Sequence, residues 1–216
     1  PRFKWNEIPL ISKQNTQKKG RPKTINLDKL VNVAMLNYWL DGPTNVSLNE
    51  ICYKAKISKP GLYREFGGED GLMKSVLLLY QSSVTQQILN LLKLEKSFDK
   101  TLDELIVFVT NNINKENKPK GCLLAKFRQS RNKFGIKTQE QIDIIIKKRR
   151  LGFQLWIEQS KSKGEFEKPI SSKNAANYID SQLDYAVSEL GNGEDNNNVK
   201  KTLTLALSVL RKNHPH

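Results

Sequence analysis

Apolar residues recur along most of this chain at the three- and four-residue spacing of an α-helix. No segment alternates between apolar and polar residues over the length of a β-strand. A first stripe consists of Leu27, Leu30, Val31, Ala34, Met35 and Tyr38, which together form one face of a helix. Similar stripes continue as far as Leu210 and predict about nine helices. We therefore expect an all-α protein.

Capping residues and glycines predict where the first three helices begin and end. The first helix opens after Asn26. The second opens at Ser47, whose hydroxyl can accept from the third residue of the helix while Glu50 reaches back, as in a capping box. The third opens at Ser58 and ends at Gly67-Gly68, because glycine stops a helix readily.

Longer helices are predicted over the rest of the chain from the same spacing. The expected ranges are 69–93, 98–113, 121–134, a helix of about 25 residues ending before Lys163, and two last helices with stripes over 175–190 and 199–210. The composition of residues 191–198 (GNGEDNNN) predicts a surface loop between these last two helices.

Composition limits the classes of protein to which the chain can belong. The apolar residues never run to 18 in succession, and the basic N-terminal stretch is not followed by an apolar block with a cleavage site, so we expect neither a membrane span nor a secretory signal. Two cysteines, Cys52 and Cys122, are too few for a disulfide framework. The expected location is the cytoplasm.

Catalytic and metal-binding patterns are not found in the sequence. There is no nucleophile with a His and acid partner and no glycine-rich phosphate loop. The two histidines, His214 and His216, have no third metal ligand nearby in sequence. We expect neither an enzyme, nor a cofactor, nor a metal site.

A net charge of +14 favours a polyanionic partner such as nucleic acid. Residues 1–25 are predicted to form a flexible basic arm, since no acidic residue lies between Glu7 and Asp28. Within the arm, Arg21 and Lys23 belong to a Gly-Arg-Pro segment of the kind that can enter a narrow minor groove. The alternative is a solvated tail.

Residues 26–70 fit a helix-turn-helix, in which two short helices joined by a tight turn pack on a longer one. The third helix would serve as the recognition element in the major groove, anchored by Leu62 and Phe66, with Lys59, Gly61, Tyr63 and Arg64 facing outward. The predicted DNA-binding residues are Arg21, Lys23, Ser47, Ser58, Lys59, Pro60, Gly61, Tyr63 and Arg64.

The segment Ser58-Lys59-Pro60-Gly61-Leu62-Tyr63-Arg64-Glu65-Phe66, with the run that precedes it from Ser47, resembles the DNA-binding domain of the TetR/AcrR family of transcriptional regulators. The start of the sixth helix, Gly121-Cys122-Leu123-Leu124, is similar to a motif of the AcrR-like branch. The resemblance implies a ligand-binding and dimerisation domain over residues 71–216. It also implies a homodimer through the last two helices, a double-stranded DNA operator and an unknown small-molecule effector.

Two departures from the family pattern affect the expected DNA contacts. Many relatives carry a phosphate-binding lysine after the recognition helix, where this chain has Gly67-Gly68-Glu69-Asp70. Glu65 stands where many relatives have an aromatic residue or a histidine, and an acid there would repel phosphate unless it accepts from a cytosine amine.

Two features of residues 71–216 allow more than one interpretation. Aromatic residues at helical spacing either line an effector cavity or belong to the core: Tyr80, Phe108, Phe127, Phe153 and Trp156. Residues 115–150 contain 12 basic residues against three acidic ones. This basic cluster is a second DNA surface, a solvated helix face, or a source of inward arginines such as Arg128 and Arg149 for an anionic ligand.

The sequence therefore favours a ligand-responsive repressor that acts as a homodimer on a pseudo-palindromic operator. Two recognition helices related by a two-fold axis enter successive major grooves only when they are one helical turn of DNA apart, or a multiple of that. The alternative function is that of a basic architectural protein that coats DNA without sequence preference, which the charge alone equally supports.

Overall fold

The computed structural model describes residues 26–93, 95–111, 119 and 121–212, and its regular secondary structure is helical. The elements are α1 Leu27–Asp41, α2 Leu48–Ala55, α3 Lys59–Phe66, α4 Glu69–Tyr80, η2 Gln81–Thr85, α5 Gln86–Leu91, α6 Phe98–Asn111, α7 Leu123–Gln129, η3 Arg131–Lys133, α8 Ile136–Ser162, α9 Ser172–Asn192 and α10 Asn196–Ser208. Because α4, the π-helical η2 and α5 follow one another without a break, these residues form nine helices and the 3-10 turn η3. The predicted all-α class is confirmed.

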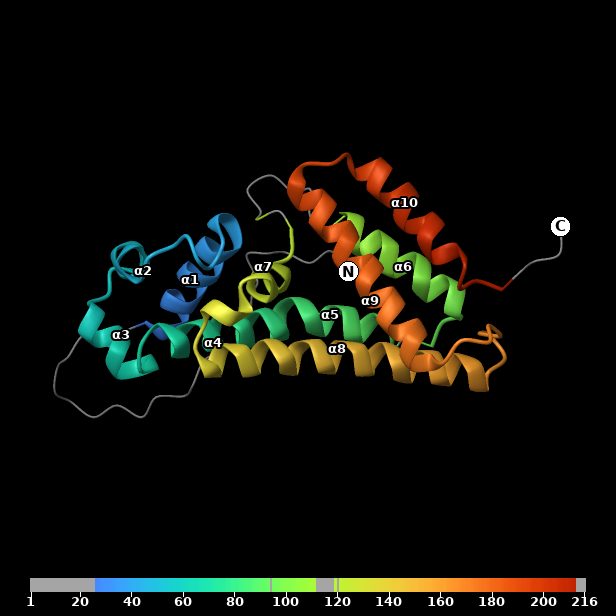
Figure 1. Ribbon diagram of the computed structural model, residues 1–216, viewed down its shortest axis with the longest axis horizontal. Coiled ribbons are helices and arrows are strands. Elements are labelled where there is room, and N and C mark those ends of the chain that lie inside the picture. The colour runs from blue at the N-terminus through green and yellow to red at the C-terminus, as the bar shows by residue number, and fades with distance from the viewer. Residues whose placement is uncertain (1–25, 94, 112–118, 120, 213–216) are drawn as a thin grey trace.

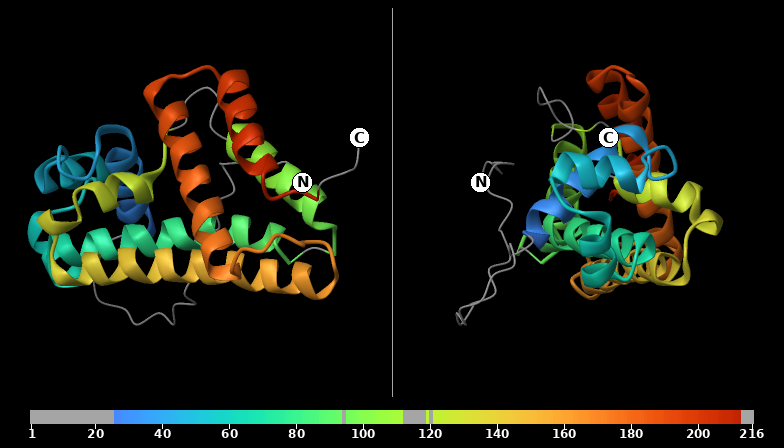
Figure 2. Two further views of the ribbon diagram at one scale, coloured as in Figure 1. Left: turned by 45° about the vertical axis from the view of Figure 1, so that its right-hand side comes forward. Right: turned by 90° about the vertical axis from the view of Figure 1, so that its left-hand side faces the viewer.

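The helices divide into a compact group at one end of the molecule and a larger group at the other (Figure 1). Helices α1, α2 and α3 form the first group. The continuous helix α4–η2–α5 and helix α8 run side by side along the long axis from this group, and α9 packs on α8 (Figures 1 and 2). Helix α10 packs on α6 and α9 at the far end.

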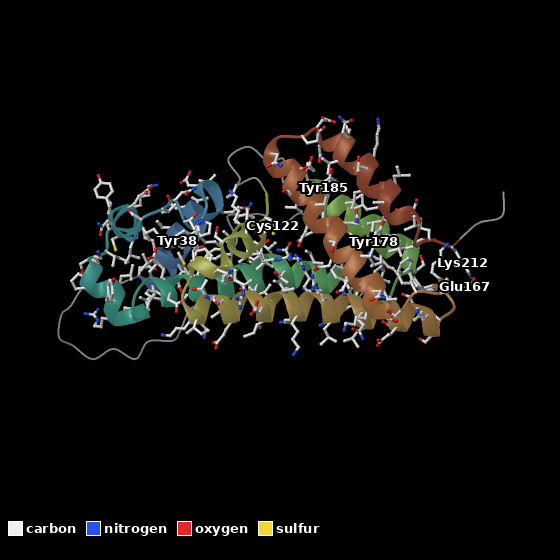
Figure 3. All side chains as sticks on the ribbon, viewed as in Figure 1. Tyr38, Cys122, Glu167, Tyr178, Tyr185 and Lys212 are labelled. Carbon is white, nitrogen blue, oxygen red and sulfur yellow. The ribbon has the colours of Figure 1, made fainter. Side chains whose placement is uncertain are left out.

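Buried apolar side chains form two separate clusters. The first joins α1–α4 to α7 and to Ile142 and Ile145 in the first half of α8, and the second joins α5, α6, the second half of α8, α9 and α10. In Figure 3, Tyr38 lies in the first cluster and Tyr178 packs against the second. The first cluster includes residues on both sides of the predicted boundary at residue 70, which therefore stays a prediction.

The caps of the first helices have the predicted geometry. Ser47 Oγ accepts from Glu50 N at 3.2 Å, and Ser58 Oγ accepts from Gly61 N at 3.3 Å. Gly67 ends α3 in the left-handed conformation with φ of 72°. The Glu50 carboxylate differs from its predicted return contact, since it accepts from Lys54 Nζ at 2.6 Å.

The predicted loop over residues 191–198 is wrong at both ends. Helix α9 continues to Asn192, and α10 already begins at Asn196. Gly193 ends α9 with φ of 96°, and Asp195 accepts from the backbone N–H groups of Asn197 and Asn198 at 3.0 Å. This cap draws the asparagines into the first turn of α10, because it satisfies two of the N–H groups that a helix start leaves unpaired.

The predicted helix over residues 69–93 contains a π-helical turn that the apolar spacing does not indicate. Ser83 Oγ donates to Leu79 O at 2.7 Å, and Gln87 Nε2 donates to Ser83 O at 2.5 Å. A π turn accommodates one more residue than an α turn, so the apolar face changes direction there. Residues before η2 face the first cluster, while Ile88 and Leu89 after it face the second.

A membrane span requires a long apolar helix, and a metal site requires clustered ligands; the residues that the structure describes supply neither. None of these helices is long and apolar enough to cross a membrane. Over the same residues, no group of three or more His, Cys, Asp or Glu side chains could hold a metal ion. His214 and His216 lie outside the described residues.

Candidate nucleic-acid interface

Helices α2 and α3 are joined by the three residues Lys56, Ile57 and Ser58. Lys56 adopts the left-handed conformation with φ of 59°, and its N–H donates to Tyr53 O at 3.1 Å. Ile57 N donates to Cys52 O at 3.0 Å. The tight turn satisfies the last carbonyls of α2 and allows α3 to start at once, which gives the predicted helix-turn-helix.

Helix α3 is anchored to the first cluster by its inner face. Leu62 is completely buried, and Phe66 is half-buried against the same cluster. The predicted exposure of Gly61 is wrong, because this residue is buried on the inner side and its N–H is bound by Ser58 Oγ. Gly61 therefore contributes to the packing of α3 rather than to its exposed face.

The outer face of α3 carries the other predicted residues of this helix. Lys59 and Pro60 are exposed in the first turn, where the missing N–H of proline leaves no intrahelical bond unmade. Tyr63 is 49% exposed, and the caps Ser47 and Ser58 are exposed as well. The structure thus brings these side chains to the end of the molecule that carries α2 and α3. Arg21 and Lys23 lie outside the described residues.

Tyr53 on α2 is a surface residue that the sequence reasoning did not select. It is 85% exposed, the largest exposure among the large hydrophobic side chains described. The sequence does contain a sign of this exposed residue: an aromatic ring on the polar side of a short helix, next to the buried Cys52. Tyr53 extends the exposed aromatic surface from α3 to α2.

The charges at the end of α3 are partly neutralised within the protein. Arg64 Nε and Glu65 Oε1 form an ion pair at 2.9 Å, and the Arg64 side chain is 65% exposed. An exposed ion pair of this kind is weak and contributes at most about 1 kcal/mol to the stability of the protein. The guanidinium of Arg64 can therefore leave Glu65 and bind a phosphate with little loss of free energy.

Gly68 separates α3 from α4 and supports the ring of Tyr63. Its backbone has φ of 116° and ψ of −163°, a region that essentially only glycine adopts. A β-carbon at this position would lie 3.3 Å from Tyr63 Cε1. The glycine therefore permits both the chain reversal and the position of the tyrosine ring.

Replacement of Gly68 by alanine is expected to lower the free energy of unfolding by about 2 to 3 kcal/mol, because the backbone strain and the contact with Tyr63 add. Chemical denaturation measures this loss. Gly164→Ala is the matched control, since Gly164 has φ of 68° and nothing within 4 Å of an added β-carbon. It should lose about 1 kcal/mol, and equal losses in the two variants would contradict the role of Gly68.

Asp70, in the first turn of α4, caps the N-terminus of α8. Its carboxylate accepts from Lys137 N at 3.1 Å, from Thr138 N at 2.9 Å and from Thr138 Oγ1 at 2.6 Å. A β-carbon on Gly135 would lie 2.4 Å from Asp70 Cγ, so glycine is needed there. Burial acts to raise the pKa of Asp70, but the hydrogen bonds from Thr138 and Lys137 outweigh it, and the pKa is lowered.

Substitution of Asp70 by asparagine is expected to lower the free energy of unfolding at pH 7 by about 1 to 2 kcal/mol, through the weakened cap and the lost charge at a helix start. Because the folded-state pKa is lowered, the carboxylate contributes fully above the ordinary value near 4 and less as the pH falls through the lowered value. Chemical denaturation of the wild type and of Asp70→Asn at pH 7 and at pH 3 measures the loss of stability and its dependence on pH.

The control for this variant is Glu140→Gln, on an exposed residue of the same helix α8, for which a change below about 0.5 kcal/mol is expected. A difference between wild type and Asp70→Asn that is as large at pH 3 as at pH 7 would show that the charge of Asp70 does not act as described.

A second set of contacts joins α1 to the start of α7. Lys126 Nζ donates to Trp39 O at 2.6 Å and to Leu40 O at 3.1 Å, while Trp39 Nε1 donates to Gly121 O at 2.9 Å. A cation at the C-terminus of α1 stabilises carbonyls that the helix leaves unpaired. The helix-turn-helix is therefore held by α7 through α1 and by α8 through α4.

The aromatic residues predicted to line an effector cavity fall into both apolar clusters. Tyr80 and Phe127 belong to the first, Phe153 and Trp156 to the second, and half-buried Phe108 packs against the second. Trp156 stacks on Phe98 with ring centroids 4.7 Å apart and also lines a hollow of about 390 Å³ between α5 and α8. The five side chains do not converge on one space.

Three of the four arginines of the basic cluster pair with aspartates of α9, and the fourth, Arg131, pairs with Asp143 of α8. Arg149 is buried and pairs with Asp180 Oδ1 at 2.5 Å and Asp184 Oδ1 at 2.8 Å, Arg150 pairs with Asp180 at 3.0 Å, and Arg128 pairs with Asp184 at 2.5 Å. Burial acts to lower the pKa of Arg149, but the two aspartates outweigh it and raise it. The inward arginine of the sequence analysis is thus neutralised by carboxylates of the protein itself.

Both cysteines, Cys52 and Cys122, are buried and free. Cys122 caps α7, with Ala125 N donating to its Sγ at 3.4 Å, and its Sγ lies 3.3 Å from Tyr80 Oη. Burial raises the pKa of both thiols, and for Cys122 the nearby Asp184 raises it further. Both side chains are therefore uncharged thiols at neutral pH.

Comparison with known proteins finds similarity in sequence over about half of the chain and similarity in fold over most of it. No family model matches the chain. The HTH-type transcriptional repressor ComR of Escherichia coli K12 is 28% identical over 107 residues, which are 49% of this chain and 51% of ComR. The chain thus matches about half the length of this curated relative.

Solved structures match over most of the chain. Reduced NemR of Escherichia coli is 13% identical with a TM-score of 0.76, over 84% of this chain and 95% of NemR. The TetR-family regulator CifR, as a cysteine mutant complexed with a 26-bp double-strand operator DNA, is 18% identical with a TM-score of 0.77, over 88% of this chain and 100% of CifR. The chain has the fold of the TetR family of transcriptional regulators, with an N-terminal helix-turn-helix followed by a helical domain.

Proposed function

We propose that the protein is a DNA-binding transcriptional repressor whose domain 26–70 reads double-stranded operator DNA. The observation that carries this proposal is the outer face of α3, where Lys59, Tyr63 and Arg64 project from a helix that is anchored from beneath by Leu62. The CifR structure, which has this fold and holds operator DNA, supports the same use of the helix-turn-helix here.

Each proposed DNA-binding residue has a defined task. Lys59 and Tyr63 meet base edges or phosphates as the first turns of α3 enter the major groove. Ser47 and Ser58 lie at helix starts, where their hydroxyls and the nearby N–H groups favour phosphate. Arg64 reaches the backbone, Pro60 shapes the first turn, and Arg21 and Lys23 follow the minor groove.

The proposed homodimer uses the last two helices, within a regulatory domain over residues 71–216. Tyr185 on α9, Leu205 on α10 and Val209 directly after α10 are apolar side chains that are 53%, 74% and 59% exposed, and a second copy would cover them. The hollow between α9 and α10 has a volume of about 130 Å³ and lies beside Tyr185.

The proposed effector acts by moving α4–η2–α5 and α8, which extend from the helix-turn-helix into the second cluster. A ligand that binds one arrangement of these helices better than the other shifts the distance between the two recognition helices of a dimer. Of the five aromatic residues that the sequence favours as its lining, Trp156 lies beside a hollow and is the one that we propose to contact the effector, while Tyr80, Phe108, Phe127 and Phe153 pack in the two apolar clusters.

Selection of bound duplexes from a random pool, followed by footprinting on the enriched sequence, tests the proposal. We expect a two-fold symmetric site whose half-sites have centres one helical turn apart, about 34 to 36 Å, or a multiple of that. Sedimentation should give twice the chain mass of 24.8 kDa. A pool without an enriched sequence would favour the alternative that the net charge of +14 supports, a basic architectural protein.

A further inference from the structure

Lys137, the second residue of α8, places its ammonium beside the C-terminal end of α3. Lys137 Nζ lies 3.9 Å from the position that a β-carbon would have on Gly67, the residue that ends α3. The start of α8 lies at the end of the molecule that carries α2 and α3 (Figure 1). A cation from residues 71–216 thus stands next to the helix that we propose to enter the major groove.

The backbone that carries Lys137 is fixed to α4. The carboxylate of Asp70 accepts from the N–H groups of Lys137 and Thr138, and Asp70 O also accepts from Thr138 Oγ1 at 3.1 Å. Gly135 permits this approach, since a side chain there would collide with the Asp70 carboxylate. Three groups of α8 therefore bind one residue of α4, and Lys137 keeps its place relative to α3.

The residues around Lys137 carry several negative charges. Glu65, Glu69 and Asp70 follow one another closely at the end of α3 and the start of α4, and Arg64 is paired with Glu65. Without another cation, this edge of the α3 face would repel phosphate. Lys137 is exposed, and among the described residues no ion pair within 4 Å joins its ammonium to a carboxylate.

We propose that Lys137 binds a backbone phosphate of the DNA beside the recognition helix, so that the start of α8 is part of the DNA interface. This inference rests on the proposed DNA-binding function. It gives the regulatory helix a direct effect on DNA, because α8 also packs along α9 and contributes to the second cluster. A movement of α8 that breaks its hydrogen bonds to Asp70 would withdraw the phosphate contact even with α3 in place.

The test is the salt dependence of binding for Lys137→Gln, from 50 to 200 mM KCl, on a duplex that the wild-type protein enriches from a random pool. The slope of log K against log salt is negative, and loss of one phosphate contact makes it less steep by about 0.9. A homodimer, which loses two contacts, should therefore show a slope less steep by about 1.8. At 150 mM salt we expect affinity to fall about five- to tenfold. Lys137→Arg should keep the wild-type slope, because it retains the charge.

Lys147→Gln is the matched control. Lys147 is an exposed lysine of the same helix, ten residues further on and therefore about 15 Å away along the axis. Its loss removes the same charge and should leave the slope unchanged. Lys137 would have only a structural role if its charge did no more than balance the carboxylate of Glu69 and the carbonyl groups at the end of α3. In that case Lys137→Gln would lower the melting temperature, and its salt slope would equal that of Lys147→Gln.

Failure of this inference differs from failure of the proposed function. Wild-type protein that enriches no duplex would overturn the proposed function, and the inference with it. Wild-type binding that Lys59→Ala weakens, combined with equal slopes for Lys137→Gln and Lys147→Gln, would overturn the inference alone. A lowered slope in a variant that unfolds at the wild-type temperature supports the phosphate contact.

Discussion

Replacement of Arg149 by methionine is expected to lower the free energy of unfolding by about 3 kcal/mol, since it leaves buried carboxylates without their main partner. The Arg149 side chain is 6% exposed and that of Asp180 is 1% exposed, and the two pair at 2.5 Å. Asp180 would keep only Arg150, and Asp184 only Arg128. Equilibrium denaturation measures the loss.

The matched control is Arg128→Met on α7. The Arg128 side chain is 37% exposed, and its pair with Asp184 should contribute less than about 1 kcal/mol. The double variant Arg149→Met/Asp180→Leu should recover much of the stability, because an apolar pair avoids the cost of burying charge. Equal losses for Arg149→Met and Arg128→Met would contradict the account of α8 and α9 as joined by a buried ion pair.

Substitution of Lys59 or Tyr63 by alanine is expected to weaken binding to an enriched operator duplex by about ten- to a hundredfold, the range for one lost base contact. Both side chains lie on the outer face of α3, and neither belongs to the apolar cluster beneath it. Binding to unrelated duplex should fall much less, because it depends mainly on phosphate contacts. Fluorescence anisotropy at fixed salt measures both affinities.

Two controls separate DNA contact from folding in this experiment. Tyr63→Phe keeps the ring beside Gly68 and removes only the hydroxyl, so it reports whether the ring or the hydroxyl group of Tyr63 contacts the DNA. Lys147→Ala removes one exposed charge far from α3 and should leave the operator affinity unchanged. Operator binding that Lys59→Ala and Tyr63→Ala leave intact would remove α3 from the interface.

The sequence predicted the parts of the fold that depend on neighbouring residues. The serine caps at Ser47 and Ser58 and the stop at Gly67 involve groups three or four residues apart, and the structure confirms each. The loop over 191–198 was predicted wrongly because composition does not reveal that Asp195 caps a helix within an asparagine run. The π turn over Gln81–Thr85 is accompanied by side-chain hydrogen bonds of Ser83 and Gln87 to backbone carbonyls, and apolar spacing does not indicate such bonds.

The parts that the sequence did not predict join residues far apart in the chain. Asp70 binds Thr138 across 68 residues, and the ammonium of Lys137 lies beside Gly67, 70 residues away in the chain, so local pattern gives no sign of either arrangement. The predicted exposure of Gly61 was wrong because the inner face of α3 is set by how the helix packs on the first cluster. Inward arginines such as Arg149 are one interpretation of the basic cluster, but the aspartate partners Asp180 and Asp184 lie on α9, too far along the chain for a local pattern to indicate them.

The central claim is that this helix-turn-helix reads DNA sequence, and a competition titration of the wild-type protein tests it most directly. Labelled enriched duplex is displaced, at one fixed salt concentration, by the same unlabelled duplex or by a shuffled duplex of equal length and composition. We predict that the shuffled duplex competes about a thousandfold less well, or more weakly still. Equal competition by the two duplexes would contradict the claim and identify a protein that binds DNA through charge alone.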